Sequence, residues 1–217
     1  MKNSKMTKFI ATLALCLFAN VSQATLITEI THDFGTDVGK ILPAGGVDGS
    51  SGCNTISADW ITVTDKKDCN RFYDYFDLSN VDYDSIDSFT LSLTFSDTNR
   101  GSWFPLEDWR VMAASSGSNA DKDNMQDIDR VSGMSSQDFI FNGSNTKASV
   151  FNDILVRKQF AFWLGDEAWF SNSFNLSSAT LKIEGTPALT STTVPEPNMI
   201  ALFALGLFFM SRTKSKK

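Results

Sequence analysis

The stretch Asp87-Ser-Phe-Thr-Leu-Ser-Leu-Thr-Phe-Ser96 decides the fold class, because apolar and polar residues alternate along most of it. A period of two places its large apolar side chains on one face of a β-strand, namely Phe89, Leu91, Leu93 and Phe95. The threonine and serine side chains between them fall on the other face. The stretch therefore predicts a half-buried strand in an antiparallel sheet, with one face on the core and the other in solvent.

The same alternation recurs on both sides of this stretch. Further strands are predicted at residues 26–31, 60–64, 72–77, 109–113, 137–141, 150–156, 160–164 and 178–184. Gly, Pro, Asn and Asp clusters separate them, and no amphipathic helix is predicted between them. Residues 114–136, rich in Ser, Gly, Asn and Asp, predict a long surface loop. The pattern predicts an all-β domain over residues 25–186, an antiparallel β-sandwich with a jelly-roll-like arrangement, and a closed barrel is the alternative.

Charge is distributed unevenly along the chain. Residues 25–193 hold 12 Lys and Arg against 24 Asp and Glu, a net charge of −12, whereas the whole chain carries −6. Binding to nucleic-acid phosphates needs a basic face, and adhesion to anionic lipid by charge needs the same. The acidic domain is therefore predicted to bind neither of them by charge, and no nucleic-acid partner is expected.

Residues 1–24 have the three parts of a secretory signal peptide. Lysines near the start precede an apolar run from Phe9 to Ala19, and the small residues Ser22 and Ala24 stand where signal peptidase reads the chain. The apolar run has 11 residues, whereas a membrane-spanning helix needs about 20. The segment predicts export with cleavage after Ala24, rather than an uncleaved membrane anchor.

The other end of the chain also has three parts. Residues 187–193 are small and polar and predict a linker. The prolines of Pro195-Glu196-Pro197 then interrupt any helix, residues 199–210 form an apolar run, and a basic tail follows. The apolar run predicts a short transmembrane helix, and the positive-inside rule would keep the basic tail in the cytoplasm.

This order of parts in residues 194–217 resembles the PEP-CTERM sorting signal of Gram-negative bacteria. In that family a membrane protease-transferase called exosortase recognises and processes the signal. The resemblance implies that Pro195, Glu196 and Pro197 form the sorting motif. It also implies insertion into the inner membrane and then sorting to the cell envelope or extracellular matrix. The alternative is a permanent single-span anchor, although a run of 12 residues covers only about 18 Å of a hydrocarbon core of about 30 Å.

Two cysteines, Cys53 and Cys69, remain after removal of the signal peptide. Disulfides persist in exported proteins, and two cysteines without a nearby histidine are a poor metal site. The sequence therefore predicts a disulfide between them. In the chain-entropy model a loop of this length adds about 3 kcal/mol of stability.

Residues 119–129 concentrate oxygen ligands, and calcium prefers six to eight of them. The candidate calcium ligands are Asp121, Asp123, Asp127 and Asp129. The spacing departs from an EF-hand, because Arg130 stands at position 12 of the loop and no flanking helices are predicted. An irregular calcium site is one interpretation, and a solvated acidic loop is the other.

Aromatic residues near predicted loops suggest a carbohydrate site. Trp103, Trp169 and Phe170 could stack on a sugar ring, with Asp166 accepting hydrogen bonds from its hydroxyls. Packing in the core of the domain explains most such residues without any ligand. Both interpretations stay open at this point.

Catalytic signatures are weak. His32 is the only histidine, and the chain lacks the G-x-S-x-G nucleophile motif, a phosphate-binding glycine loop and a zinc motif. The acidic pairs Glu107-Asp108 and Asp166-Glu167 suit a glycosidase only by coincidence among many carboxylates. The sequence therefore predicts a non-enzymatic structural protein associated with exopolysaccharide. A lectin-like module or a calcium-dependent adhesin is the alternative, and a polysaccharide-acting enzyme is the least favoured.

Overall fold

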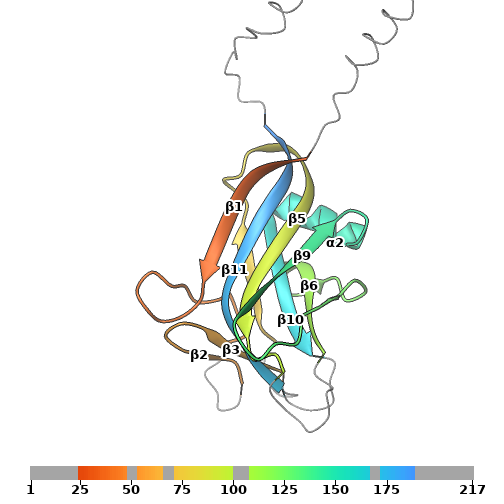
Figure 1. Ribbon diagram of the computed structural model, residues 1–217. Coiled ribbons are helices and arrows are strands. Elements are labelled where there is room, and N and C mark those ends of the chain that lie inside the picture. The colour runs from red at the N-terminus through yellow and green to blue at the C-terminus, as the bar shows by residue number, and fades with distance from the viewer. Residues whose placement is uncertain (1–23, 48–52, 66–70, 100–107, 167–171, 189–217) are drawn as a thin grey trace, which may run out of the picture.

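The computed structural model describes residues 24–47, 53–65, 71–99, 108–166 and 172–188 (Figure 1). Most of this part forms two antiparallel sheets. The larger sheet consists of β1 (Thr25–Asp33), β2 (Thr55–Ile56), β3 (Ile61–Asp65), β5 (Tyr83–Ser96), β9 (Ser135–Asn142) and β11 (Asn172–Pro187). The smaller sheet consists of β4 (Tyr73–Asp77), β6 (Trp109–Ser116), β7 (Asn119–Ala120), β8 (Gln126–Asp127) and β10 (Gln159–Asp166). The predicted antiparallel β fold is confirmed at this level.

Strand β11 organises the larger sheet. Its first residues pair with β3, its later residues pair with β1, and β5 runs along its other edge. The alternating stretch that predicted the fold class lies in β5, and its four large apolar side chains are fully buried. The prediction of a half-buried strand is therefore confirmed.

One hydrophobic cluster receives side chains from both sheets. Phe89 of β5 and Phe160 of β10 have ring centroids 5.0 Å apart, and Trp109 of β6 meets Phe174 of β11 at 4.6 Å. Because aromatic pairs at these separations attract each other beyond simple burial, the rings link the two sheets across the core.

The predicted strand at residues 150–156 is wrong, because this segment belongs to helix α2 (Ala148–Arg157). Val150, Phe151 and Ile154 are buried, a spacing of one and four residues that fits one face of a helix rather than one face of a strand. Lys158 ends the helix in the left-handed conformation, and its backbone N–H donates to the carbonyl of Ile154. Short apolar runs are ambiguous between the two structures, and here the helical period is the one that is buried.

The segment predicted as a long loop, residues 114–136, starts inside β6 and contains β7 and β8, which both pair with β6. The segment is therefore attached to the edge of the smaller sheet. The predicted helix at residues 199–210 lies outside the described residues. Within the described ranges, the structure contains no helix with the length and apolar character to cross a membrane.

The first and last strands of the domain meet at one end. Thr25 is paired in register with Gly185, and its hydroxyl donates to the Gly185 carbonyl at 3.1 Å. Figure 1 shows the start of β1 and the end of β11 together at the top of the molecule. The segments that precede residue 24 and follow residue 188 therefore join the domain at the same end.

Candidate functional site

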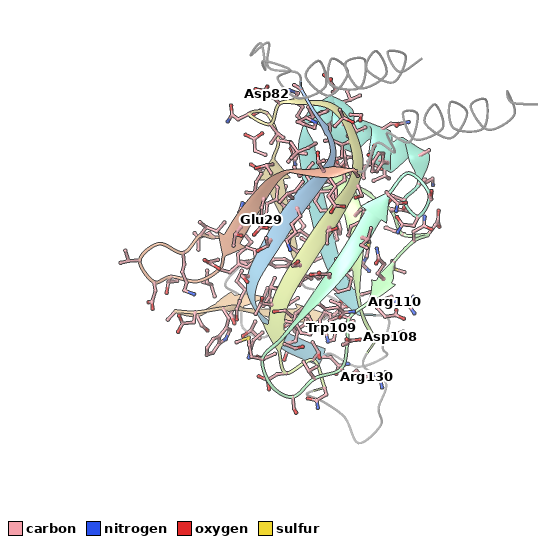
Figure 2. All side chains as sticks on the ribbon, turned by 45° about the horizontal axis from the view of Figure 1, so that its top comes forward. Glu29, Asp82, Asp108, Trp109, Arg110 and Arg130 are labelled. Carbon is pink, nitrogen blue, oxygen red and sulfur yellow. The ribbon has the colours of Figure 1, made fainter. Side chains whose placement is uncertain are left out.

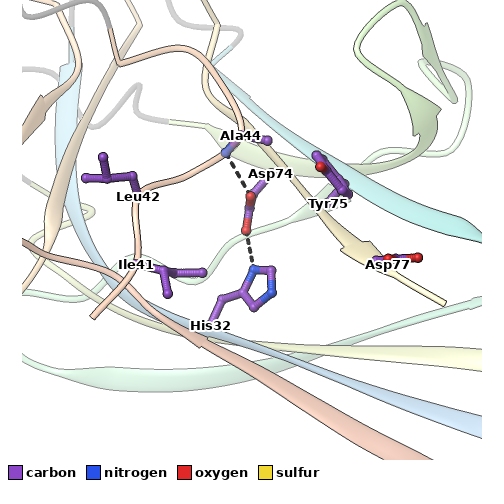
Figure 3. A pocket seen from close by; sticks show the side chains of 7 residues that line it. All are labelled: His32, Ile41, Leu42, Ala44, Asp74, Tyr75 and Asp77. Atoms are coloured by element: carbon purple, nitrogen blue, oxygen red, sulfur yellow. Dashed lines mark hydrogen bonds and ion pairs between the residues drawn. The ribbon is translucent and has the colours of Figure 1, made fainter. Parts of the chain in front are cut away.

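A histidine and an aspartate join the edges of the two sheets. His32 lies near the end of β1 in the larger sheet, and Asp74 lies in β4 of the smaller sheet. The Nδ1–H of His32 donates to Oδ2 of Asp74 at 2.6 Å (Figure 3). A hydrogen bond this short is typical of a charged acceptor. The pair therefore fastens one strand of each sheet to the other.

The surroundings hold this pair in place. Asp74 is 2% exposed, and its second oxygen accepts the backbone N–H of Ala44 at 2.9 Å. The ring of His32 packs on the buried ring of Phe76, with centroids 4.3 Å apart. Asp74 and Phe76 are two residues apart in β4, so both side chains point to the same, inward face. The carboxylate thus has hydrogen-bond partners at both oxygens, which offsets the cost of its burial.

A cavity of about 230 Å³ lies beside the pair. Its lining consists of His32, Ile41, Leu42, Ala44, Asp74, Tyr75 and Asp77. The backbone N–H of Ser79 donates to Asp77 at 2.8 Å, and this bond lowers the pKa of the Asp77 carboxyl. Asp77 is therefore an ionised hydrogen-bond acceptor at neutral pH. The cavity lining combines an imidazole, two carboxylates and several apolar side chains.

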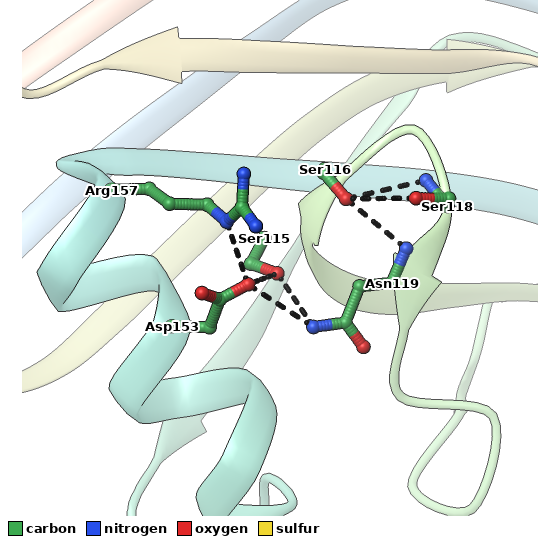
Figure 4. Close-up of polar contacts among 6 residues, drawn as sticks. All are labelled: Ser115, Ser116, Ser118, Asn119, Asp153 and Arg157. Atoms are coloured by element: carbon green, nitrogen blue, oxygen red, sulfur yellow. Dashed lines mark hydrogen bonds and ion pairs between the residues drawn. The ribbon is translucent and has the colours of Figure 1, made fainter.

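A second polar cluster connects helix α2 to the smaller sheet (Figure 4). Asp153 of the helix accepts hydrogen bonds from the hydroxyl of Ser115 at 2.6 Å, from Arg157 at 2.8 Å and from the amide of Asn119 at 3.2 Å. The Ser115 hydroxyl, followed by Arg157, lowers the pKa of the Asp153 carboxyl. All the partners are side chains of β6, β7 and the helix itself, which indicates a structural role.

We expect this cluster to make part of the stability depend on pH. A carboxyl whose pKa is lowered by folding stabilises the folded state above its unfolded pKa, and the contribution is lost as the pH falls through the folded pKa. Asp153→Asn should therefore reduce the free energy of unfolding at neutral pH. Below about pH 4 the free energies of unfolding of the variant and of the unchanged protein should become more similar. Urea unfolding at a series of pH values measures this difference. Ser115→Ala should remove more of the pH-dependent part than Arg157→Gln, and the opposite order would contradict the assignment.

The four predicted calcium ligands do not gather at one point. Asp121 is buried. Asp127 forms an ion pair with Arg110 at 3.0 Å, and the exposed Asp123 forms one with Lys147 at 3.5 Å. Asp129 is exposed, and its main chain bonds to the side chains of Thr98 and Gln137. In the described part of the chain, no three His, Cys, Asp or Glu side chains are grouped so that they could hold a metal ion. The calcium site stays a prediction that this geometry does not support.

Asp121 has a structural environment instead. Its carboxylate accepts the backbone N–H of Lys147, the residue just before α2, at 2.5 Å and the amide of Asn124 at 2.9 Å. Negative charge near the start of a helix is favourable, because the first backbone N–H groups point toward it. The carboxylate thus ties the residues after β7 to the beginning of the helix.

Asp121→Ala is expected to lower the free energy of unfolding by about 1–3 kcal/mol, because it removes a buried carboxylate that accepts the backbone N–H of Lys147 and the amide of Asn124. The loss should be the same with added calcium and with chelator. Asp123→Ala is the matched control, since that exposed carboxylate should cost less than about 0.5 kcal/mol. Thermal melts of the three proteins under both conditions test the prediction. A melting temperature that falls on chelation would contradict a purely structural role and support the calcium site.

Most of the predicted carbohydrate site cannot be placed. Trp103, Trp169 and Phe170 lie outside the described residues. Asp166 is the last residue of β10 and is paired in register with Trp109. Trp109 itself is buried against Phe174. The carbohydrate site at these four residues therefore stays a prediction.

Of the predicted disulfide, the structure places one cysteine. Cys53 is 8% exposed, whereas Cys69 lies outside the described residues. If the bond forms, the intact mass of the unreduced protein is lower by two hydrogen masses, and Cys69→Ala should cost about 3 kcal/mol of stability. Mass spectrometry before and after reduction measures the first, and urea unfolding measures the second. An intact mass that does not change on reduction would contradict the predicted disulfide.

Charged side chains also gather at the end of the domain away from Thr25. Figure 2 shows Asp108, Arg110 and Arg130 at this end and Asp82 at the other. Arg110 bonds to Asp108 at 2.9 Å and to Asp127 at 3.0 Å. The guanidinium is therefore engaged by carboxylates and fixes the position of β8 beside β6.

Comparison with known proteins identifies the end of the chain. Residues 193–216 match the family described as "PEP-CTERM protein-sorting motif". The resemblance inferred for Pro195, Glu196 and Pro197 is thereby confirmed, and the signal implies an exported protein that is sorted by exosortase. No curated protein matches the chain. The match is confined to the C-terminal signal.

Proposed function

We propose, from the premise that the chain carries a PEP-CTERM sorting signal, that this protein is a non-enzymatic component of the cell envelope or extracellular matrix of a Gram-negative bacterium. After export and processing by exosortase it would associate with exopolysaccharide. The sorting signal at residues 193–216 is the observation that carries the proposal. The net charge of −12 between residues 25 and 193 is compatible with such a location, because it disfavours nucleic acid and anionic lipid as partners.

The positions of Thr25 and Gly185 support an orientation in which one end of the domain faces the membrane. Thr25, the first residue after the predicted signal peptide, pairs with Gly185 close to the start of the sorting tail. The predicted linker, residues 187–193, reaches at most about 25 Å when fully extended. While the tail is in the membrane, the end of the domain that contains Thr25 would face the membrane. The end that contains Arg110 and Arg130 would then face outward.

We also infer a finer description of the fold. Contacts such as Phe89 with Phe160 support two sheets that pack face to face as a β-sandwich. The jelly-roll-like arrangement stays a prediction. A rigid sandwich suits a protein whose role is to be presented at a surface.

A catalytic role is not part of the proposal. A His–Asp pair acts in hydrolysis when it activates a nucleophile within hydrogen-bond reach. The lining described for the cavity beside His32 contains no serine, threonine or cysteine. Asp74 is buried and both of its oxygens accept hydrogen bonds, which favours a role for the pair in joining the sheets.

The intact mass of the protein from its native host tests the proposal. Membrane and extracellular-matrix fractions should be measured separately. A matrix form that lacks residues 1–24 and the tail after the Pro195-Glu196-Pro197 motif is expected. A membrane form that retains Lys217, with none of the protein in the matrix, would contradict the proposal and favour a permanent anchor.

A further inference from the structure

We propose that the cavity between β1, β4 and residues 41–44 binds one neutral sugar residue. His32 and Asp77 would form hydrogen bonds with its hydroxyl groups, and Tyr75, Ile41 and Leu42 would contact its C–H groups. The proposal deepens the proposed function, on which it rests, because it assigns the contact with exopolysaccharide to named residues.

The cavity lining includes polar side chains that can accept hydrogen bonds. A carboxylate can only accept, so Nδ1 of His32 carries the hydrogen of the bond to Asp74 and Nε2 is the ring nitrogen left for a ligand, an acceptor in the neutral tautomer. In Figure 3 this second nitrogen lies on the side of the ring nearer Asp77. Asp77 adds an ionised carboxylate. Hydroxyl groups of a ligand can donate to both.

The larger apolar side chains of the cavity lining are exposed to solvent. Tyr75 is 41% exposed, Leu42 is 67% exposed and Ile41 is 36% exposed. These are three of the nine large hydrophobic side chains that are exposed in the described part of the chain. Sugars combine hydroxyl groups with apolar C–H groups, so a cavity lined by both hydrogen-bonding and exposed apolar side chains matches their chemistry.

Other classes of ligand fit the lining less well. The cavity has no lysine or arginine in its described lining, and it belongs to a domain of strongly negative net charge. Phosphates and acidic sugars would therefore be repelled. A metal ion would need at least a third protein ligand, and the described residues hold no such group.

The walls of the cavity are held by backbone hydrogen bonds. Ile41 N–H donates to the Asp33 carbonyl at 2.8 Å, and the backbones of Gly45 and Tyr73 exchange two hydrogen bonds of 3.2 and 3.4 Å. A Cβ atom at Gly45 would lie 2.1 Å from the Tyr73 ring, so a larger residue there would require this ring to shift. Walls fixed in this way reduce the ordering cost of binding. The volume of about 230 Å³ is below the range of about 300–1,000 Å³ for drug-sized ligands, which favours one sugar unit over an oligosaccharide.

The single histidine makes the test direct. His32 is the only histidine of the chain, so the imidazole ¹H and ¹⁵N resonances report on this cavity without further assignment. The probes are methyl glycosides of glucose, galactose, mannose and N-acetylglucosamine, with methyl glucuronide as the acidic comparison. At least one neutral glycoside should shift the His32 resonances in a saturable way, and the glucuronide should bind at least about tenfold more weakly.

Two variants test the assigned contacts. Tyr75→Ala and Asp77→Asn should each weaken binding by about tenfold or more while the melting temperature changes little, because both side chains are exposed. Trp60→Ala and Asp129→Asn are the matched controls, since both replace exposed side chains outside the cavity. These controls should bind as the unchanged protein does. Equal binding by all four variants would overturn the assignment.

Failure of this proposal can be distinguished from failure of the proposed function. The unchanged protein should also be sedimented with exopolysaccharide purified from its native host. If it co-sediments but no glycoside shifts His32, the cavity proposal is overturned and the proposed function stands. If it neither co-sediments nor responds to any glycoside, association with exopolysaccharide is overturned as well. Tighter binding of the glucuronide than of the neutral glycosides would also overturn the proposal.

Discussion

Glu196→Ala is expected to leave the C-terminal signal on the protein and to remove the processed form from the extracellular matrix. Residues 193–216 match the PEP-CTERM sorting motif, and processing by exosortase requires recognition of that motif. The substitution removes the one charged side chain between the two prolines. The intact masses of the protein in membrane and matrix fractions measure the effect.

The domain itself should not respond to this change. The last described strand ends at Pro187, before the motif begins, so the melting temperature of the Glu196→Ala protein should equal that of the unchanged protein. Thr192→Ala, which alters the predicted linker before the matched segment, is the matched control and should be processed normally. Processed Glu196→Ala protein in the matrix at the normal amount would show that the glutamate is dispensable.

The strands could be predicted because their signal is local. In β5, apolar residues at every second position indicate one buried face, and the structure buries them. The residues paired with them in β11, such as Leu181 and Ile183, are buried as well. The helix at residues 148–157 could not be predicted in the same way. Its short apolar run fits both periods, and contact with the smaller sheet decides between them.

The cavity beside His32 was not predicted, for a different reason. Its two central residues are 42 positions apart and come from edge strands of different sheets. No local sequence pattern indicates that two residues so far apart in the chain are in contact. One signal was present, however, because Asp74 stands between Phe72 and Phe76 on the inward face of a predicted strand. A charged residue at a buried position needs a partner, and His32 is that partner.

The acidic segment shows the limit of composition as evidence. Asp121 and Asp123 are both aspartates and lie two positions apart in the same acidic segment. Asp121 is nevertheless buried against the start of α2, whereas Asp123 is exposed. The difference depends on where the helix packs. Shared ligation of an ion was one interpretation of the sequence spacing, whereas the structure gives each carboxylate separate contacts.

Phe160→Ala is expected to lower the free energy of unfolding by about 3–5 kcal/mol. The ring of Phe160 is fully buried in β10 of the smaller sheet. It meets Phe89 at 5.0 Å and Phe141 at 5.7 Å, both from the larger sheet. Its removal would leave a cavity between the sheets and break two aromatic contacts at once. Since domains are stable by about 5–15 kcal/mol, a large part of the stability would be lost.

Urea unfolding followed by tryptophan fluorescence measures this loss. Ile140→Ala is the control, because Ile140 lies in β9 beside Phe141 but is 49% exposed. Alternation along β9 directs Ile140 away from the core and Phe141 into it. The control should therefore cost much less than Phe160→Ala. Equal costs for the two substitutions would mean that the sheets are not held together through Phe160, and the face-to-face packing inferred for the domain would have to be abandoned.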